Sequence, residues 1–207
     1  MNTLIEDINQ PDSAALGERA SVLTDIYDDK KNIAVWRRSL PETLETYFDR
    51  TLEQQKLVNV AREIGAGSMV SDIGYALSRF PENTQFSQHV EELVDMFSCL
   101  FDLSRVGLRI RTLDTAMCPK FHVDRVPCRL VTTFSGSGTQ WLPHESVDRS
   151  GGHFEPIERL IRNLNCGDVG LLKGELWQGN ENRGLVHRSP TLATGENQRL
   201  LLTLDFL

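Results

Sequence analysis

Hydrophobic positions in the first half of the chain recur at helical spacing. Between residues 42 and 64 apolar side chains recur at spacings that keep them near one face of a helix, and Gly65 and Gly67 end the run. Ser39-Leu-Pro-Glu42 has the pattern of a capping box, with a proline near the first turn. A second apolar stripe predicts a helix from Thr84 to Leu103. We therefore expect two amphipathic helices that pack on a sheet. The apolar positions of the first are Leu44, Tyr47, Phe48, Leu52, Leu57, Val60 and Ile64.

The pattern changes at Val106 to short runs of strand length. These runs are rich in Leu, Val and Thr and are bounded by Gly, Pro, Asn or Ser. Short strands in succession favour a sandwich or a barrel over alternating βα units. The runs are VGLRIRTL, RLVTTFSG, GDVGLLKGELW, RGLVHRS and QRLLLTLDFL.

The two patterns divide the chain into three parts and predict an α+β fold. Residues 1–40 are polar and mixed, which predicts a loosely docked N-terminal arm. Residues 41–103 form a helical support region, and residues 104–207 form the β core. With 207 residues in total, the last two parts are expected to fold as one unit.

Composition and charge exclude several classes of function. The chain is 40% hydrophobic and 25% charged, with a net charge of −7 and no Lys/Arg-rich run. Electrostatic binding of nucleic acid is therefore not expected. No apolar stretch reaches the roughly 18 residues of a membrane helix, and MNTLIEDINQPDS lacks the features of a signal peptide. These observations predict a cytoplasmic protein. The four cysteines show no CxxC pairing, which predicts reduced, mostly buried thiols.

Phe121-His122-Val123-Asp124 is the most informative segment for chemistry. In an extended chain, His122 and Asp124 point to the same side, so both can bind one metal ion. His187 follows an apolar strand run and is the candidate third ligand. Two histidines and one carboxylate form the facial triad of non-haem Fe(II) enzymes. The alternative is a chance HxD pattern whose histidine is only packed or exposed in a strand.

Three further features favour a metal site. His187 lies far enough after His122 for several strands to close a barrel between them. Arg199 begins the last strand run, so one hairpin would return its guanidinium to the pocket, where it could hold a carboxylate. A turn and an apolar strand, Cys166–Gly174, stand just before the third ligand.

This order of motifs resembles the Fe(II)/2-oxoglutarate-dependent dioxygenases, which are double-stranded β-helix (cupin-like jelly-roll) proteins. The resemblance implies that His122, Asp124 and His187 bind Fe(II) and that Arg199 anchors 2-oxoglutarate. One position departs from the pattern: many such enzymes carry Ser or Thr two residues after the arginine, where this chain has Leu201. The next polar side chain on that face would be Thr203.

The C-terminal half is also similar to a more specific group, a bacterial family of domains of unknown function (number 1826). The similarity extends from about Val106 to Leu207, and it implies a link to zinc-responsive metallochaperone GTPases. The helical half carries no matching motif. The segments that carry the similarity are Cys118–Asp124, Arg129-Leu130, Gly138–Trp141, Leu172–Gly174 and His187–Pro190.

Two other functions stay open on the same barrel. Zinc also accepts His and Asp ligands, and Cys118 or Cys128 could add a soft ligand, which would make the protein a zinc-linked binder or hydrolase. A cupin-like sensor or interaction domain without chemistry is the third reading. The sequence does not identify the substrate, small molecule or protein, and it leaves a homodimer open.

Several residues near these motifs have ordinary structural readings that we favour. Arg109 and Arg111 are expected on a solvated outer face of a strand. His144 and His153 lie in a polar loop that could be a lid but is more typical of an ordinary connecting loop. Trp141 and Trp177 could form a wall of the pocket, although large aromatic side chains more often lie in the hydrophobic core.

Overall fold

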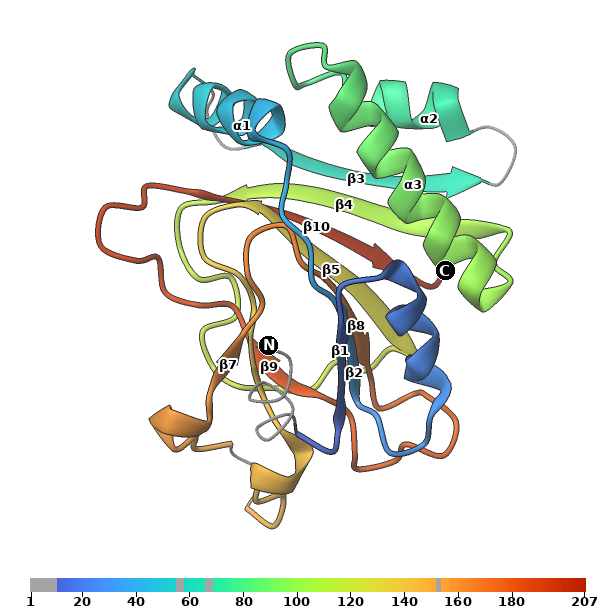
Figure 1. The fold of residues 1–207 in the computed structure, drawn as a ribbon, viewed down its shortest axis with the longest axis vertical. Coiled ribbons are helices and arrows are strands. Elements are labelled where there is room, and N and C mark those ends of the chain that lie inside the picture. Colours follow the sequence, from blue (N-terminus) through green and yellow to red (C-terminus); the bar gives the residue numbers. More distant parts are fainter. Residues whose placement is uncertain (1–10, 55–57, 66–68, 152–153) are drawn as a thin grey trace, which may run out of the picture.

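The computed structural model describes residues 11–54, 58–65, 69–151 and 154–207. It shows a large sheet with helices on one face and a small sheet on the other (Figure 1). The expected α+β fold class is thereby confirmed. None of the described helices is long and apolar enough to span a membrane.

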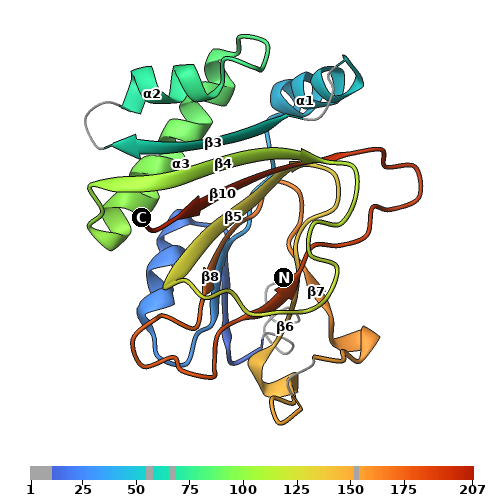
Figure 2. The same cartoon turned by 180° about the vertical axis from the view of Figure 1, so that it is seen from behind.

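The large sheet has seven strands, and residues distant in the sequence lie side by side in it. Every neighbouring pair is antiparallel except β1 and β2, which are parallel. Figure 2 shows the strands of this sheet from β3 to β8 from behind. In spatial order the strands are β1 (Ala14–Gly17), β2 (Ile33–Trp36), β8 (Val169–Lys173), β5 (Cys128–Ser135), β10 (Arg199–Asp205), β4 (Arg105–Leu113) and β3 (Asn59–Gly65).

The small sheet has three antiparallel strands and faces the large one. Its order is β7 (Arg162–Asn163), β6 (Gln140–Leu142) and β9 (Val186–Arg188). An isolated antiparallel bridge joins His122 to His187, the central residue of β9, which is an outer strand of this sheet. The five strand runs predicted from Val106 onward all contain strands of these two sheets.

The helices gather over one face of the large sheet. They are α1 (Glu42–Gln54), α2 (Met69–Ala76), α3 (Thr84–Phe101) and the 3-10 helix η2 (Ala20–Tyr27). Two short 3-10 turns, η3 (His144–Ser146) and η4 (Glu158–Leu160), lie in the connections of the small sheet. An aromatic cluster attaches the helices to the sheet: Phe134 of β5 lies 5.1 Å from Phe48 of α1 and 5.4 Å from Phe86 of α3, between ring centroids.

Residues 11–40 do not form the loosely docked arm that the polar composition of residues 1–40 predicted; residues 1–10 lie outside the described residues. Residues 14–17 and 33–36 form β1 and β2 of the large sheet, and β2 pairs with β8. Ile33, Ala34 and Val35 are buried. The apolar run IAVW is short enough to be overlooked among polar neighbours, but four residues suffice for an added strand.

The first predicted helix also ends earlier than expected. Helix α1 stops at Gln54, and β3 follows from Asn59 to Gly65, paired with β4. Val60 and Ile64 are buried as predicted, but on a strand. A spacing of four residues places two side chains on one face of either a helix or a strand, so it did not distinguish the two.

Alternation along the central strands divides their side chains between two layers. On β10, Leu200, Leu202 and Leu204 pack in the core beneath the helices. Leu201 packs instead in the core between the two sheets, which also contains Trp141 of β6. Odd-numbered side chains of β10 therefore face the small sheet, and this is the side on which the candidate site lies.

Asn83 caps the N-terminus of helix α3, and replacing this residue tests where the helix begins. The side chain of Asn83 accepts a hydrogen bond from the backbone N–H of Phe86 at 2.9 Å. We expect Asn83→Ala to lower the free energy of unfolding by about 1 kcal/mol, and the melting temperature by roughly 2–4 °C. Thermal unfolding followed by circular dichroism measures this. Asp95→Ala, on the exposed middle of the same helix, should not lower the melting temperature, because alanine has the higher helix propensity. An equal loss in both variants would contradict the cap.

Candidate metal centre

His122 and His187 are neighbours because their backbones pair. The N–H of His122 donates to the carbonyl of His187 at 3.0 Å, and the N–H of His187 donates to the carbonyl of His122 at 2.9 Å. The two rings consequently lie on one side of the bridge, with centroids 4.6 Å apart. Asp124 follows two residues after His122 in the segment that leads to β5.

The three predicted ligands converge on one point. His122 Nε2 lies 3.6 Å from Asp124 Oδ1, and His187 Nε2 lies 3.4 Å from Asp124 Oδ2. Each residue offers one ligand atom, and these atoms all lie within 4.8 Å of one another. Among the residues that the structure describes, this is the one group of three or more metal-ligating side chains so placed, and none of them comes from a helix. Two nitrogens and one carboxylate oxygen match the donor set of a facial triad.

Both imidazoles are oriented by backbone carbonyls. His122 Nδ1 lies 2.9 Å from the carbonyl oxygen of Lys120, and His187 Nδ1 lies 3.1 Å from that of Leu185. A carbonyl can only accept, so each Nδ1 carries the proton and donates. Each Nε2 is then the nitrogen that faces Asp124: in the neutral ring its lone pair is available to a metal ion, and in the protonated ring its N–H donates to the carboxylate of Asp124.

Asp124 is held in its charged form by its neighbours. Burial works to raise the pKa of this carboxyl, but hydrogen bonds with His122 and His187 and the charge of Arg129 outweigh it, so the pKa lies well below its usual range. The hydrogen bond with Asp124 raises the pKa of His122. Arg129 donates to Asp124 through Nη1 and to Asp205 Oδ1 through Nε, the latter at 2.6 Å. An ionised carboxylate in fixed position is what a hard or borderline cation needs.

Arg199 lies in the same cavity as the three potential ligands. Its side chain is fully buried, and burial lowers its pKa to about 10 while the charge of Glu196 opposes that shift. The guanidinium donates to Ser189 Oγ at 3.0 Å and to Thr133 Oγ1 at 3.2 Å. Its Nε has no hydrogen-bond partner within the described part of the chain. A buried cation bonded only to neutral hydroxyls has unused capacity for an anion.

The cavity has a volume of about 90 Å³ and lies between the sheets. Val131, Leu172 and Leu201 contribute apolar surface to its wall, opposite the polar side chains. Such a mixture of an apolar wall with few converging polar groups is typical of ligand sites.

Sequence reasoning missed the two residues whose hydroxyls accept from Arg199, which are Ser189 and Thr133. Of the two, Ser189 lines the cavity. Both had a detectable signal: Ser189 lies two residues after His187, and Thr133 lies on the same face of β5 as Arg129 and Val131. Their hydroxyls bond Arg199, a role that Leu201 cannot fill because it has no hydroxyl.

Other predicted residues fall into different places. The expectation of mostly buried thiols is wrong, because only one of the four free cysteines is buried. That one is Cys128, which lies beneath the helices. Burial raises the pKa of the Cys128 thiol, which is thereby an unsuitable ligand. Cys118 is exposed and lines the cavity, but it is not in the ligand group. His144 lies in η3, outside that group, and His153 lies outside the described residues.

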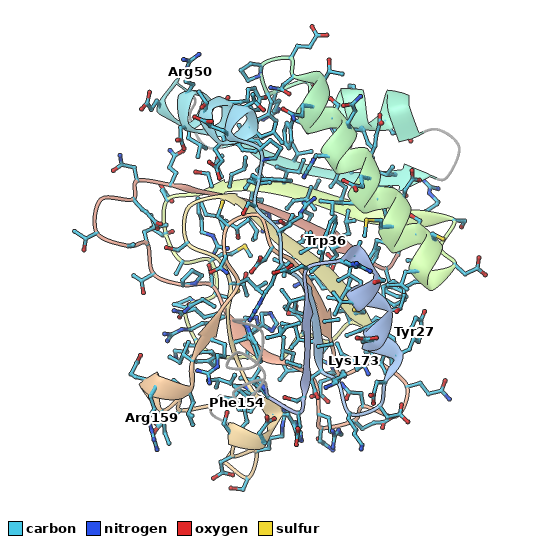
Figure 3. The ribbon with its side chains drawn as sticks, in the orientation of Figure 1. Tyr27, Trp36, Arg50, Phe154, Arg159 and Lys173 are labelled. Carbon is cyan, nitrogen blue, oxygen red and sulfur yellow. The ribbon has the colours of Figure 1, made fainter. Side chains whose placement is uncertain are left out.

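The tryptophans and arginines singled out in the sequence also lie in different parts of the structure. Trp141 is buried in the core between the sheets, with His187 as its strand partner. Trp177 packs on the helix side, under the ammonium of Lys173 at 4.7 Å from the ring centroid. Lys173 Nζ also donates to the carbonyl of Asp28, directly after η2, at 3.0 Å, so this lysine belongs to the helix side as well (Figure 3). Arg109 and Arg111 lie on the face of β4 opposite buried Leu108 and Ile110 and are half-buried, and both line a second cavity that sequence analysis did not foresee.

Comparisons with known proteins give a family and a fold. The model of the family described as "Protein of unknown function (DUF1826)" matches residues 17–205. A search among curated proteins found no match to the sequence. Among solved structures, the chain is similar to dioxygenase for auxin oxidation 1 from Arabidopsis thaliana, in a complex with 2-oxoglutarate, at 10% identity and a TM-score of 0.50; the match covers 94% of this chain and 91% of that one.

A second similar structure is a prolyl-4-hydroxylase from Pseudomonas putida. It is 12% identical with a TM-score of 0.50, and the match covers 90% of this chain and 97% of that one. At such low identity these similarities establish a shared fold.

Proposed function

We propose that this chain, which belongs to the DUF1826 family, is an Fe(II)- and 2-oxoglutarate-dependent oxygenase. One observation carries the proposal: a His–Asp–His group and a buried, incompletely bonded arginine share one cavity. The similarity in fold to a dioxygenase bound to 2-oxoglutarate supports it.

His122, Asp124 and His187 would hold the metal. Their donor set suits Fe(II), which would keep coordination positions for other molecules beside three protein ligands. When bound, ferrous iron would supply the redox chemistry with O₂. The carbonyls of Lys120 and Leu185 hold the histidine rings in the required tautomer, and Arg129 fixes the carboxylate. Losing such supporting partners typically costs roughly 10- to 100-fold in metal affinity.

Arg199 would bind the distal carboxylate of 2-oxoglutarate. A planar guanidinium suits a carboxylate, and burial strengthens the pair because little water competes. The hydroxyls of Ser189 and Thr133 hold the guanidinium in place and can donate to the same carboxylate. The apolar side chains of Val131 and Leu201 would exclude water from the co-substrate.

We also propose that the two facing sheets form a double-stranded β-helix of the cupin-like kind. Supporting this are the seven-stranded and three-stranded sheets, the apolar core between them and the fold shared with the dioxygenase and the hydroxylase. The ligands at the edge of the small sheet and the arginine on the large sheet would then meet between the two layers.

A zinc protein is the second candidate, and the position of Cys118 favours it. This exposed thiol lines the same cavity as the three ligands. A movement of its loop toward the ligands would complete a site of two His, one Asp and one Cys, a tetrahedral set that zinc accepts.

The metal and the co-substrate can be tested on one preparation. We expect freshly purified protein to contain, or to take up anaerobically, one iron per chain. Adding 2-oxoglutarate to the Fe(II) protein without oxygen should produce the weak visible charge-transfer band of a chelated keto acid. Elemental analysis and anaerobic absorbance measure the two steps. Tightly held zinc that iron cannot replace, with no absorbance band, would contradict the oxygenase and favour the zinc protein.

A further inference from the structure

A second cavity of about 240 Å³ lies directly beside the metal cavity. The two share the side chains of Met117, Arg129, Leu201 and Thr203. Arg109 and Arg111 complete the wall of the second cavity. A molecule in the second cavity would therefore lie next to the candidate metal centre.

Three arginines give this cavity a positive charge. Arg109 and Arg129 both pair with the carboxylate of Asp205, and Arg129 also pairs with Asp124. The side chain of Arg109 is still 42% exposed, so part of its guanidinium is free to contact a ligand. This positive cluster stands out in a chain whose net charge is −7.

Arg111 has no carboxylate partner within the described residues. One terminal nitrogen donates to the sulfur of Met117 at 2.9 Å, and the buried Nε has no hydrogen-bond partner there either. A half-buried guanidinium bonded only to a thioether leaves most of its donors unused. Such a group is suited to receive an anion from outside the chain.

The sheet holds these arginines in a defined position. Arg109 and Arg111 alternate with buried Leu108 and Ile110 on β4, so both point to the face of the metal cavity. Arg111 is the strand partner of Leu201, and Arg109 is the partner of Thr203. Their backbones are fixed by hydrogen bonds to β10 and to β3 on either side, and a preorganised site of this kind costs little ordering on binding.

We propose that this second cavity binds the acidic group of the substrate, a carboxylate or a phosphate monoester, through Arg111 and Arg109. The substrate would be a small organic acid or phosphate ester. Its apolar part would pass Leu201 and Met117 toward the metal centre, which both cavities border. That the bound molecule is oxidised rests on the proposed function, whereas anion binding itself does not.

The test titrates the full chain with inorganic phosphate and, separately, with acetate, in the presence and absence of saturating 2-oxoglutarate. Isothermal titration calorimetry measures affinity, and the preference between the two anions separates a phosphate ester from a carboxylic acid. We expect at least one of them to bind with 2-oxoglutarate present. Arg111→Gln should weaken that anion by roughly tenfold or more, and Arg111→Lys by less.

Arg105→Gln is the matched control, since Arg105 lies on the same strand but pairs with Glu63 at 2.9 Å and lines neither cavity. It should bind the anion like the wild type. All three variants should keep their melting temperature and their affinity for the metal and for 2-oxoglutarate. Unchanged melting of Arg111→Lys and Arg111→Gln excludes misfolding as the cause of a lost anion.

Three results would overturn the proposal. The first is that neither anion binds the wild type. The second is that Arg111→Gln binds the anion with the same affinity as the wild type. The third is that 2-oxoglutarate displaces the anion and that Arg111→Gln no longer binds 2-oxoglutarate. The last result would assign the cavity to the co-substrate. Anion binding that depends on Arg111 in a wild type that never binds 2-oxoglutarate would support the anion site while refuting the proposed oxygenase.

Discussion

Alanine at His122, Asp124 or His187 is expected to abolish stoichiometric binding of one divalent metal ion. Each change removes one of three ligand atoms that lie within 4.8 Å of one another. The loss should exceed the roughly 10- to 100-fold that removing a merely orienting group typically costs. The fold should survive, because two of the three side chains are only half-buried and the apolar cores are untouched.

Elemental analysis and an Fe(II) titration under anaerobic conditions measure this loss. His144→Ala is the matched control: it removes a half-buried histidine outside the ligand group, so full metal content is expected. The assigned metal centre would be refuted if two of the three ligand variants still held one metal per chain.

The second large effect is expected at Arg199, where the oxygenase and zinc readings differ. In Arg199→Gln the buried charge partner of 2-oxoglutarate is lost. Truncating one member of a buried charge pair typically costs about 2–5 kcal/mol, so affinity should fall by tens to thousands of fold. Lysine should restore only part of it, because it lacks the planar fork. Metal binding should persist, since Arg199 is not in the ligand group.

The charge-transfer band of the anaerobic Fe(II)–2-oxoglutarate complex measures the affinity of each variant. Arg38→Gln serves as the control, because Arg38 is a half-buried arginine that lines neither cavity and donates to the carbonyl of Gly167. It should leave 2-oxoglutarate affinity unchanged. An unchanged affinity in Arg199→Gln would remove this arginine from the co-substrate site while the metal centre stands.

Helix α3 and the later strands could be predicted because their signals are local. The helix has a regular apolar stripe and a capping asparagine, and it begins at Thr84 as predicted. Strand β4 follows a strict alternation from Val106 to Leu113. Where the pattern was short or ambiguous, prediction failed. Residues 33–36 were too few to signal a strand, and residues 59–64 fit a helix and a strand equally well.

The candidate ligands could likewise be selected from residue type and spacing. His122 and Asp124 lie two residues apart, and His187 and Arg199 stand at the ends of apolar runs. The backbone bridge between His122 and His187 realises the predicted proximity.

Only the tertiary structure decided how strands distant in sequence align. The register of β10 against β5 and β4 placed Arg199 near Thr133 and put Arg111 beside Leu201. A shift of one residue would send each of these side chains to the helix side, and the periodicity of a single strand is identical in either case. The sequence by itself therefore determined which residues could bind a metal and an anion. Cross-strand register and burial determined that Arg199 and Arg111 have no carboxylate partner within the described residues, because register and burial depend on pairing between segments far apart in the chain.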